Sequence, residues 1–240
     1  MTTLVLTAHG SADPRSAVNA HAVADRVASI RPGLDVRLAF LDHSSPSLAG
    51  VLRSVDGPTV ITPLLLANAY HARVDIPRQI GGCRPRFEMR QADVLGEDDR
   101  LVSVLSQRVA ELGVSRFDEK LGVLVVAIGT SDPMVNARTA RVAPKLLAGT
   151  GWAGATTALA TRPERSLAEG LGRLRRQGAR RVVIAPWFLA PGRLPDRVQR
   201  FADAAGIAVA APLGAHRLVA ETVLDRFDQA LNARPERIPA

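Results

Sequence analysis

The chain repeats itself once, and this repeat limits the folds open to it more than any other feature of the sequence. Residues 8–14 (AHGSADP) align with residues 127–133 (AIGTSDP), 119 positions later. Residues 63–67 (PLLLA) align with residues 186–190 (PWFLA), 123 positions later. Two copies of one unit therefore account for the whole chain of 240 residues. We expect two domains of the same fold, residues 1–117 and 118–240, arranged as an internal pseudo-dimer.

Within each copy, short β-rich runs alternate with stretches that have helical apolar spacing. In the first copy this helical spacing covers residues 16–30, 46–54 and 98–112. The expected strands are residues 4–8, 36–41, 59–65 and 87–91 in the first copy and 122–128, 156–160, 181–187 and 207–210 in the second. Alternating strands and helices indicate right-handed crossover units and a parallel sheet covered by helices. The predicted fold is therefore α/β: two tandem flavodoxin-like domains, each a four-stranded parallel sheet flanked by helices.

Charge is distributed unevenly between the two copies. Residues 1–119 contain 13 Lys and Arg against 14 Asp and Glu, whereas residues 120–240 contain 18 against 9, and nearly all of these cations are arginine. Arginine forms bidentate pairs with carboxylates and phosphates, so a polyanionic ligand and a solvated basic surface are both open interpretations. Nucleic acid is not the expected partner, because no recognised binding motif is present and only 4% of the residues are aromatic.

The composition also indicates where the protein works. No apolar run approaches the roughly 18 residues that span a bilayer, so no membrane association is expected. The first apolar run ends at His9, which makes it too short for a signal peptide. The single cysteine, Cys83, excludes an internal disulfide and fits a reducing compartment. These features predict a cytoplasmic protein.

Three possible metal ligands follow strands of the first copy. His9 comes directly after the first expected strand, Asp42 after the second, and His71 lies in the loop after the third. Because the carboxyl ends of parallel strands meet at one edge of a sheet, we expect these side chains to lie close together. Two imidazoles and one carboxylate leave coordination positions open, which suits Fe(II), Co(II) or Ni(II) in exchange with a substrate.

The second copy provides an internal control for this interpretation. The positions of the three candidate ligands are occupied there by Ile128, Thr161 and Leu194, while scaffold residues such as Gly129 and Pro133 are kept. Joint loss of all three indicates that they act as a unit and that one of two ancestral sites has been lost. The chain contains no P-loop, no G-x-G-x-x-G motif and no G-x-S-x-G elbow, so neither nucleotide binding nor serine hydrolysis is expected.

At these residues the sequence resembles the class II tetrapyrrole chelatases, the family of sirohydrochlorin ferrochelatases and cobaltochelatases of the SirB and CbiX type. The resemblance rests on AHGS at residues 8–11 with the following Asp-Pro, on AFLD at 39–42, and on PLLL at 63–66 running to His71 and Asp-Ile-Pro. It covers essentially the whole chain, in a long form with two repeats. The family usually has glutamate where this chain has Asp42, and Gly-Tyr-His where this chain has Ala-Tyr-His.

The resemblance implies a chelatase-like fold for each domain and an enzyme, a lyase that inserts a divalent metal ion into sirohydrochlorin without ATP or an organic cofactor. It implies that His9 and His71 bind the incoming metal and accept pyrrole protons, and that Asp42 assists. Iron, giving siroheme, is the expected metal, and cobalt, on the way to cobalamin, is the alternative. A function of another class also stays open: a metal-binding carrier or sensor with the same ligands and no catalysis.

A tetrapyrrole polycarboxylate requires an electropositive binding surface, which the second copy can supply. The expected substrate-binding residues are Ser11, Arg15, Tyr70, Arg73, Arg162, Arg193 and Arg197. The chain is expected to work as a monomer whose two copies face each other across the substrate.

Overall fold

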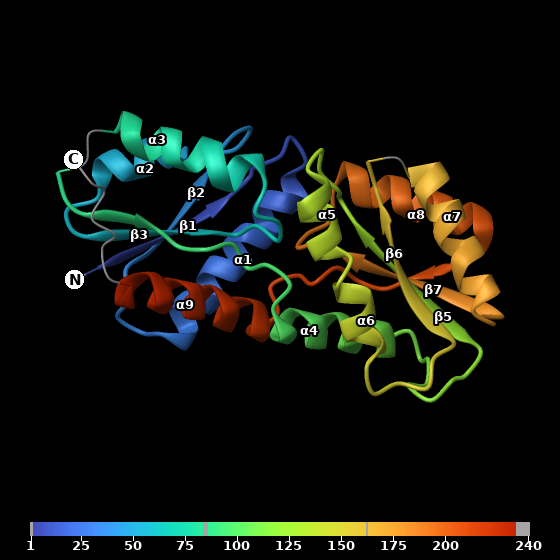
Figure 1. Cartoon of the computed structure of the whole chain (residues 1–240). Helices are drawn as coiled ribbons and strands as arrows, with labels where there is room; N and C mark the ends of the chain where they lie inside the picture. Colours follow the sequence, from blue (N-terminus) through green and yellow to red (C-terminus); the bar gives the residue numbers. More distant parts are fainter. Residues whose placement is uncertain (1, 84–85, 162, 234–240) are drawn as a thin grey trace.

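The computed structural model describes residues 2–83, 86–161 and 163–233, and it contains two four-stranded parallel sheets (Figure 1). The first sheet has the strand order β2-β1-β3-β4, with β1 (Thr3–Ala8), β2 (Val36–Phe40), β3 (Thr59–Pro63) and β4 (Met89–Gln91). The second has the order β6-β5-β7-β8, with β5 (Leu121–Ala127), β6 (Gly154–Leu159), β7 (Arg181–Trp187) and β8 (Ala208–Val209). The two halves therefore share one flavodoxin-like topology, in agreement with the sequence repeat.

The central strands are mostly apolar because both faces of each sheet are covered. Every residue of β1 and β5 is buried. In β1, Leu4 and Leu6 belong to one apolar cluster, whereas Val5 points to the opposite face and belongs to another. This alternation with a period of two is the burial pattern of a strand between two layers of helices.

Helices cover both faces of each sheet. The first sheet has α1 (Pro14–Ile30) and α9 (Arg217–Asn232) on one face, and α2 (Leu48–Ser54) and α3 (Ile76–Gly82) on the other. The second has α4 (Asp99–Ala110) and α6 (Val142–Leu147) on one face, and α7 (Pro163–Arg176) and α8 (Arg193–Ala205) on the other. Two short helices stand at strand ends: α5 (Pro133–Thr139) precedes α6, and the π-helical turn η1 (His71–Asp75) leads into α3.

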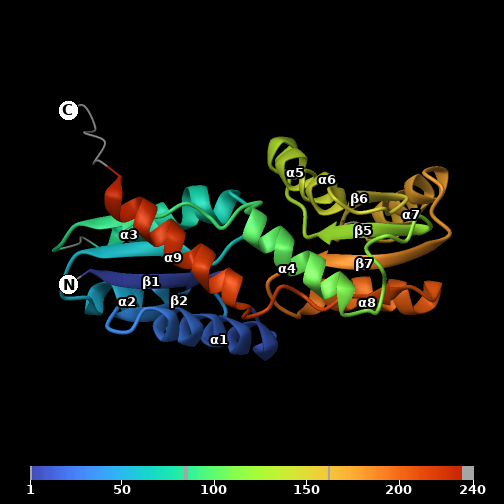
Figure 2. The ribbon, with the colours of Figure 1, turned by 90° about the horizontal axis from the view of Figure 1, so that it is seen from below.

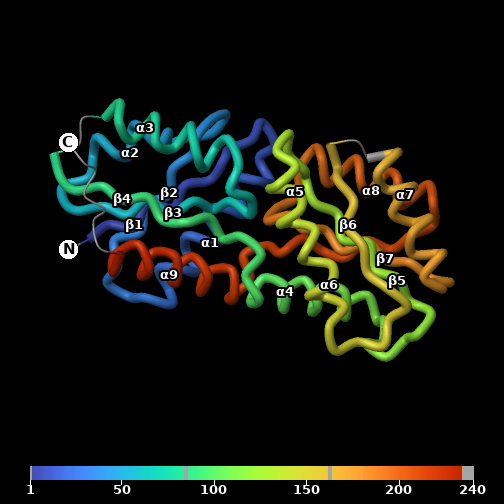
Figure 3. The backbone as a smooth tube through the Cα atoms, in the orientation of Figure 1, coloured from blue at the N-terminus to red at the C-terminus, as the bar shows by residue number. Residues whose placement is uncertain are grey.

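The two halves exchange helices. Although α4 follows the last strand of the first sheet, it packs on β7 of the second, and α9 crosses back to pack on β3 of the first. Figures 2 and 3 show α9 lying along the first sheet and α4 beside the second. The exchanged helices also contact each other, so one apolar cluster runs through both halves.

Partly buried ion pairs join the exchanged helices. Arg226 on α9 donates to Asp98, which precedes α4, and Arg100 on α4 donates both to Asp98 and to Asp225 on α9. The Asp98 carboxylate is only 14% exposed, and its hydrogen bond with Arg100 lowers its pKa to about 2. The network therefore contributes to the contact between the halves.

The predicted fold is confirmed. All eight expected strands are present, with ends that differ by at most two residues. The loop expected after the third strand instead contains η1 and α3. The division at residues 117 and 118 stays a prediction, and both α4 and α9 pack across it.

Candidate metal and substrate site

The carboxyl ends of the strands in each half face the other half (Figure 2). Two ion pairs bridge the halves at this place. Arg15, at the start of α1, donates to Asp196 in the first turn of α8, and Arg73 in η1 donates to Asp132, the N-cap of α5. Side chains at these strand ends therefore lie where the two halves meet, and we call this region between the facing strand ends the cleft.

His9 is placed by the sharp turn that follows β1. Its backbone carbonyl accepts a hydrogen bond of 3.0 Å from the N–H of Asp42, which joins the turns after β1 and β2. Gly10 has φ +88°, and a Cβ there would lie 1.7 Å from the carbonyl oxygen of Asp42. Only glycine fits between the two turns, which explains why the histidine is followed by Gly10.

His71 faces His9 across the end of the first sheet. The two Nε2 atoms lie 2.8 Å apart, with the rings nearly perpendicular. The Nδ1 of His71 contacts the carboxylate of Asp75, one helical turn later, at 2.5 Å, and that carboxylate also accepts from Arg78 at 3.1 Å. Asp75 is buried, so its carboxylate holds the His71 ring in one orientation.

The outer contacts of the two rings determine where their protons lie. The Nδ1 of His9 lies 2.8 Å from the carbonyl oxygen of Gly10, which can only accept, so this nitrogen carries a hydrogen. The Nδ1 of His71 likewise donates to the Asp75 carboxylate. In the neutral rings both Nε2 atoms are then unprotonated, and their lone pairs converge on one point. Such a pair can share one proton or hold one cation.

Asp42 does not join the histidine pair. Its carboxylate is 69% exposed and lies 3.3 Å from the Nε2 of His43. Among the described residues, no group of three His, Cys, Asp or Glu is placed to hold a metal ion. The acidic residue that contacts the pair is Asp75, and the four-residue spacing between His71 and Asp75 on a helical turn was the signal for it in the sequence.

The predicted substrate residues of the first half surround the cleft. The Ser11 hydroxyl accepts from the Asp13 N–H at 3.0 Å, and Tyr70 is 59% exposed with its ring edge-on to His71. Arg15 is engaged by Asp13 as well as by Asp196, and its hydrogen bond lowers the pKa of Asp13 to about 2. Solvent screens exposed ion pairs, so a substrate carboxylate can compete for Arg15.

The contact of Arg73 with Asp132 is of the same exposed kind. The pKa of Asp132 is lowered chiefly by the backbone N–H groups that it caps, with a smaller effect of Arg73. The N-terminus of α5 thus holds the Asp132 carboxylate, and an anionic ligand could compete with this carboxylate for Arg73.

The predicted arginines of the second half differ in their surroundings. Arg193 and Arg197 are exposed in the first turns of α8, next to the Asp196 that pairs across the cleft. Arg162 lies outside the described residues. Arg165, the next arginine along the chain, pairs with Glu169 on its own helix. The structure therefore places Arg193 and Arg197, but not Arg165, as cations without an acidic partner on their own helix.

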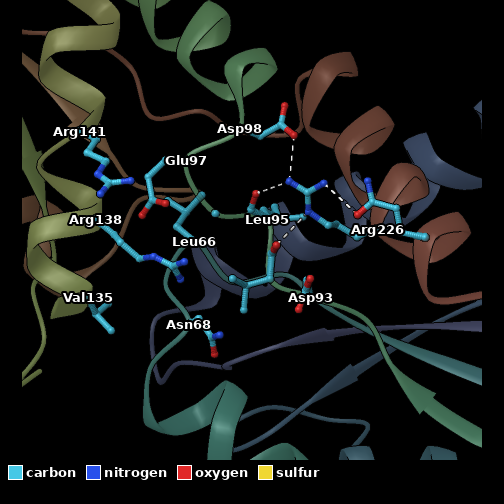
Figure 4. Close-up of a pocket in the computed structure, with 13 residues that line it drawn as sticks. Leu66, Asn68, Asp93, Leu95, Glu97, Asp98, Val135, Arg138, Arg141 and Arg226 are labelled. Atoms are coloured by element: carbon cyan, nitrogen blue, oxygen red, sulfur yellow. Dashed lines mark hydrogen bonds and ion pairs between the residues drawn. The ribbon is translucent and has the colours of Figure 1, made fainter. Parts of the chain in front are cut away.

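A cavity of about 620 Å³ also opens between the halves (Figure 4), and neither His9 nor His71 lines it. Its walls come from the loops after β3 and β4, from the α5–α6 region and from α9. Three carboxylates and three guanidiniums line it: Asp93, Glu97, Asp98, Arg138, Arg141 and Arg226. This balanced charge is not the electropositive lining that a polycarboxylate requires.

The fold and the cleft define a two-lobed α/β protein of the chelatase-like class. The chain belongs to the CbiX family, whose model matches residues 3–112 and 122–230. The resemblance found in the sequence is thereby confirmed. The matched segments coincide with the two repeats, so both copies descend from the same family unit.

Individual relatives agree with this assignment. The chain is 29% identical over 250 residues to a sirohydrochlorin ferrochelatase of Priestia megaterium, covering 98% of this chain and 92% of the relative. It is 24% identical to a sirohydrochlorin cobaltochelatase of the same organism, covering 83% of this chain and 68% of the relative. Its fold matches that of SirB from Bacillus subtilis with Fe3+, with a TM-score of 0.81, 20% identity and 96% of each chain covered. None of the described helices is both long and apolar enough to cross a membrane.

Proposed function

We propose that this protein is a sirohydrochlorin chelatase that inserts Fe(II) to give siroheme, and that the convergent Nε2 atoms of His9 and His71 hold the metal before insertion. The 2.8 Å separation of these atoms supports the proposal. With metal–nitrogen bonds of about 2.1 Å, a length typical of imidazole ligands, that separation gives an angle of about 85° at the ion. This is close to the right angle between neighbouring ligands of an octahedral ion.

Two ligands leave most of the coordination sphere of the metal open, which transfer to a tetrapyrrole requires. Insertion forms four metal–pyrrole bonds and releases two pyrrole protons. As the ion leaves, the Nε2 atoms of His9 and His71 regain their lone pairs, and each can accept one of these protons. The charges balance without ATP, because the dication replaces two protons.

The surroundings of the pair fit this sequence of events. Asp75 fixes the tautomer of His71 and stabilises its ring when it becomes protonated. Asp42 would reach an incoming ion only by leaving His43, so we assign it a role in metal delivery rather than in the resting pair. Arg15, Arg73, Arg193 and Arg197 would bind the carboxylates of the substrate around the cleft.

Cobalt is the second candidate metal. Two imidazoles discriminate poorly between neighbouring first-row ions, and one of the relatives is a cobaltochelatase. We further propose that the enzyme acts as a monomer in the cytoplasm, since the pseudo-dimer already supplies both walls of the cleft and the one cysteine fits a reducing compartment.

The test is anaerobic incubation of the protein with sirohydrochlorin and Fe(II) or Co(II), with loss of the free-base absorbance as the readout. We expect the wild type to accelerate insertion over a protein-free control, and His9→Ala and His71→Ala each to abolish the acceleration. The matched control is His21→Ala, which removes an exposed histidine of α1 outside the pair. Metal binding without any acceleration of insertion would favour a carrier or sensor instead.

A further inference from the structure

Half of the exposed large apolar side chains in the described part of the chain lie near the strand ends where the two halves meet. Eight large apolar side chains are exposed among the described residues. Two of them, Tyr70 and Val74, lie just before or in η1, and two more, Ile128 and Met134, follow β5. Exposed apolar side chains are ordinary when scattered, but a group of them around one site indicates contact with a ligand.

Ile128 stands where the second half has lost its histidine. Its carbonyl accepts from the N–H of Thr161 at 3.1 Å, as the carbonyl of His9 accepts from Asp42 at 3.0 Å. The glycine after it, Gly129, has φ +86°, close to the +88° of Gly10. Because the two turns have the same backbone geometry, Ile128 has the same position at the end of β5 that His9 has at the end of β1. It is 50% exposed.

Met134 is a second exposed apolar residue where the second half meets the first. It lies in the first turn of α5, is 74% exposed, and its N–H donates to the carboxylate of Asp132. That carboxylate accepts from Arg73 of η1, so the start of α5 lies beside the turn that begins with His71. Figure 1 shows α5 on the side of the second half that faces the first.

We propose that Ile128 and Met134 form the seat for one flat face of the tetrapyrrole, so that the opposite face of the ring is turned to His9 and His71 and metal enters from that face alone. This proposal rests on the proposed function. A macrocycle is apolar on its faces and charged at its rim, and it therefore fits an apolar floor surrounded by arginines. Methionine adapts its shape to flat ligands, which suits Met134 to this position.

The proposal explains why apolar residues, Ile128 and Leu194, occupy the two histidine positions in the second half. An imidazole at position 128 would lose its hydration against the ring without gaining a partner. It would also offer the metal a competing ligand on the far side of the macrocycle. Ile128 avoids both effects and adds apolar contact area.

The experiment compares Ile128→Gln, Met134→Gln and the double variant with the wild type. Titration with metal-free sirohydrochlorin, followed by absorbance or fluorescence, gives its Kd, and a separate Co(II) titration gives the metal affinity. We expect each single variant to raise the tetrapyrrole Kd about tenfold, from the apolar area each side chain would bury, while Co(II) affinity stays unchanged. In turnover, KM for the tetrapyrrole should rise and kcat should change little.

Phe117→Gln is the matched control. Phe117 is also an exposed apolar residue, but it precedes β5, so it lies at the opposite edge of the sheet from Ile128. If the wild type binds sirohydrochlorin and inserts metal but the double variant has an unchanged tetrapyrrole Kd, this inference is overturned and the proposed function is not. A wild type that does not bind the tetrapyrrole would overturn the proposed function with it. A double variant that changes only the molar mass in light scattering would assign the patch to contact between copies instead.

Discussion

Gly10→Ala is expected to be much more harmful than its small size suggests. Gly10 has φ +88°, and a Cβ there would lie 1.7 Å from the carbonyl oxygen of Asp42 and 2.9 Å from its carbonyl carbon. Gly33 has the same φ of +88°, yet a Cβ there would meet nothing within 4 Å. The pair of variants therefore separates the backbone strain, which both share, from the collision, which only Gly10→Ala suffers.

The expected magnitudes follow from these contacts. Gly33→Ala should lower the free energy of unfolding by about 1–2 kcal/mol, the cost of an L-residue in the left-handed region. In Gly10→Ala the Asp42 carbonyl must retreat by about 1.5 Å to reach ordinary contact distance, which adds about 1–3 kcal/mol as overpacking does. Because the Asp42 N–H holds the carbonyl of His9 at 3.0 Å, the same shift displaces His9.

Urea unfolding at pH 7 measures the loss of unfolding free energy, and Co(II) titration of the folded variants measures the effect of displacing His9. We expect Gly10→Ala to lose at least tenfold in metal affinity, and Gly33→Ala to bind as the wild type does. Equal unfolding free energies for the two variants, together with unchanged metal binding in Gly10→Ala, would refute the argument that this turn positions the histidine.

Three further predictions concern charged groups. Asp75→Asn should weaken Co(II) binding about 10–100-fold, because the amide no longer fixes the tautomer of the imidazole it contacts; unchanged affinity would exclude that role. Asp98 has a pKa lowered to about 2 in the folded state, so its contribution of about 2 kcal/mol is present above its unfolded pKa of 3.8 and is lost as the pH falls through 2. Urea unfolding at pH 5 and pH 2 should therefore show a larger acid loss for the wild type than for Asp98→Asn, and equal losses would contradict this. Charge reversal at Arg193 and Arg197 should raise the KM for sirohydrochlorin severalfold without changing Co(II) affinity, whereas the same double reversal in the last turn of α7 should change neither.

The repeat and the periodicity of the sequence were sufficient to predict the strands, their order along the chain and the edge at which the site lies. They could not predict the exchange of α4 and α9. An amphipathic helix presents the same apolar stripe whichever sheet it covers, so its sequence does not say on which half it packs.

The closeness of His9 and His71 was predictable from the sequence, whereas the carboxylate that contacts them was not. His9 and His71 follow β1 and β3, and the topology brings both to one sheet edge. Asp42 reaches the same edge, but the turn around Gly10 directs its carbonyl inward and leaves its carboxylate beside His43. Asp75 was missed because a loop was expected after β3, and the four-residue spacing from His71 brings the two side chains together only on the helical turn that forms there.

The exchange of helices has a consequence for synthesis. The first sheet is complete in sequence at Gln91, but the helix that covers one of its faces ends only at Asn232. At bacterial and eukaryotic elongation rates, the ribosome needs about 7–30 s to make the segment between them. α1 already covers the part of this face over β2, but the part over β3 and β4 stays open during that time and can accept either the chain's own α9 or that of another nascent chain. Two chains made close together can thus exchange α9, and we expect an exchanged dimer as the assembly error of this arrangement.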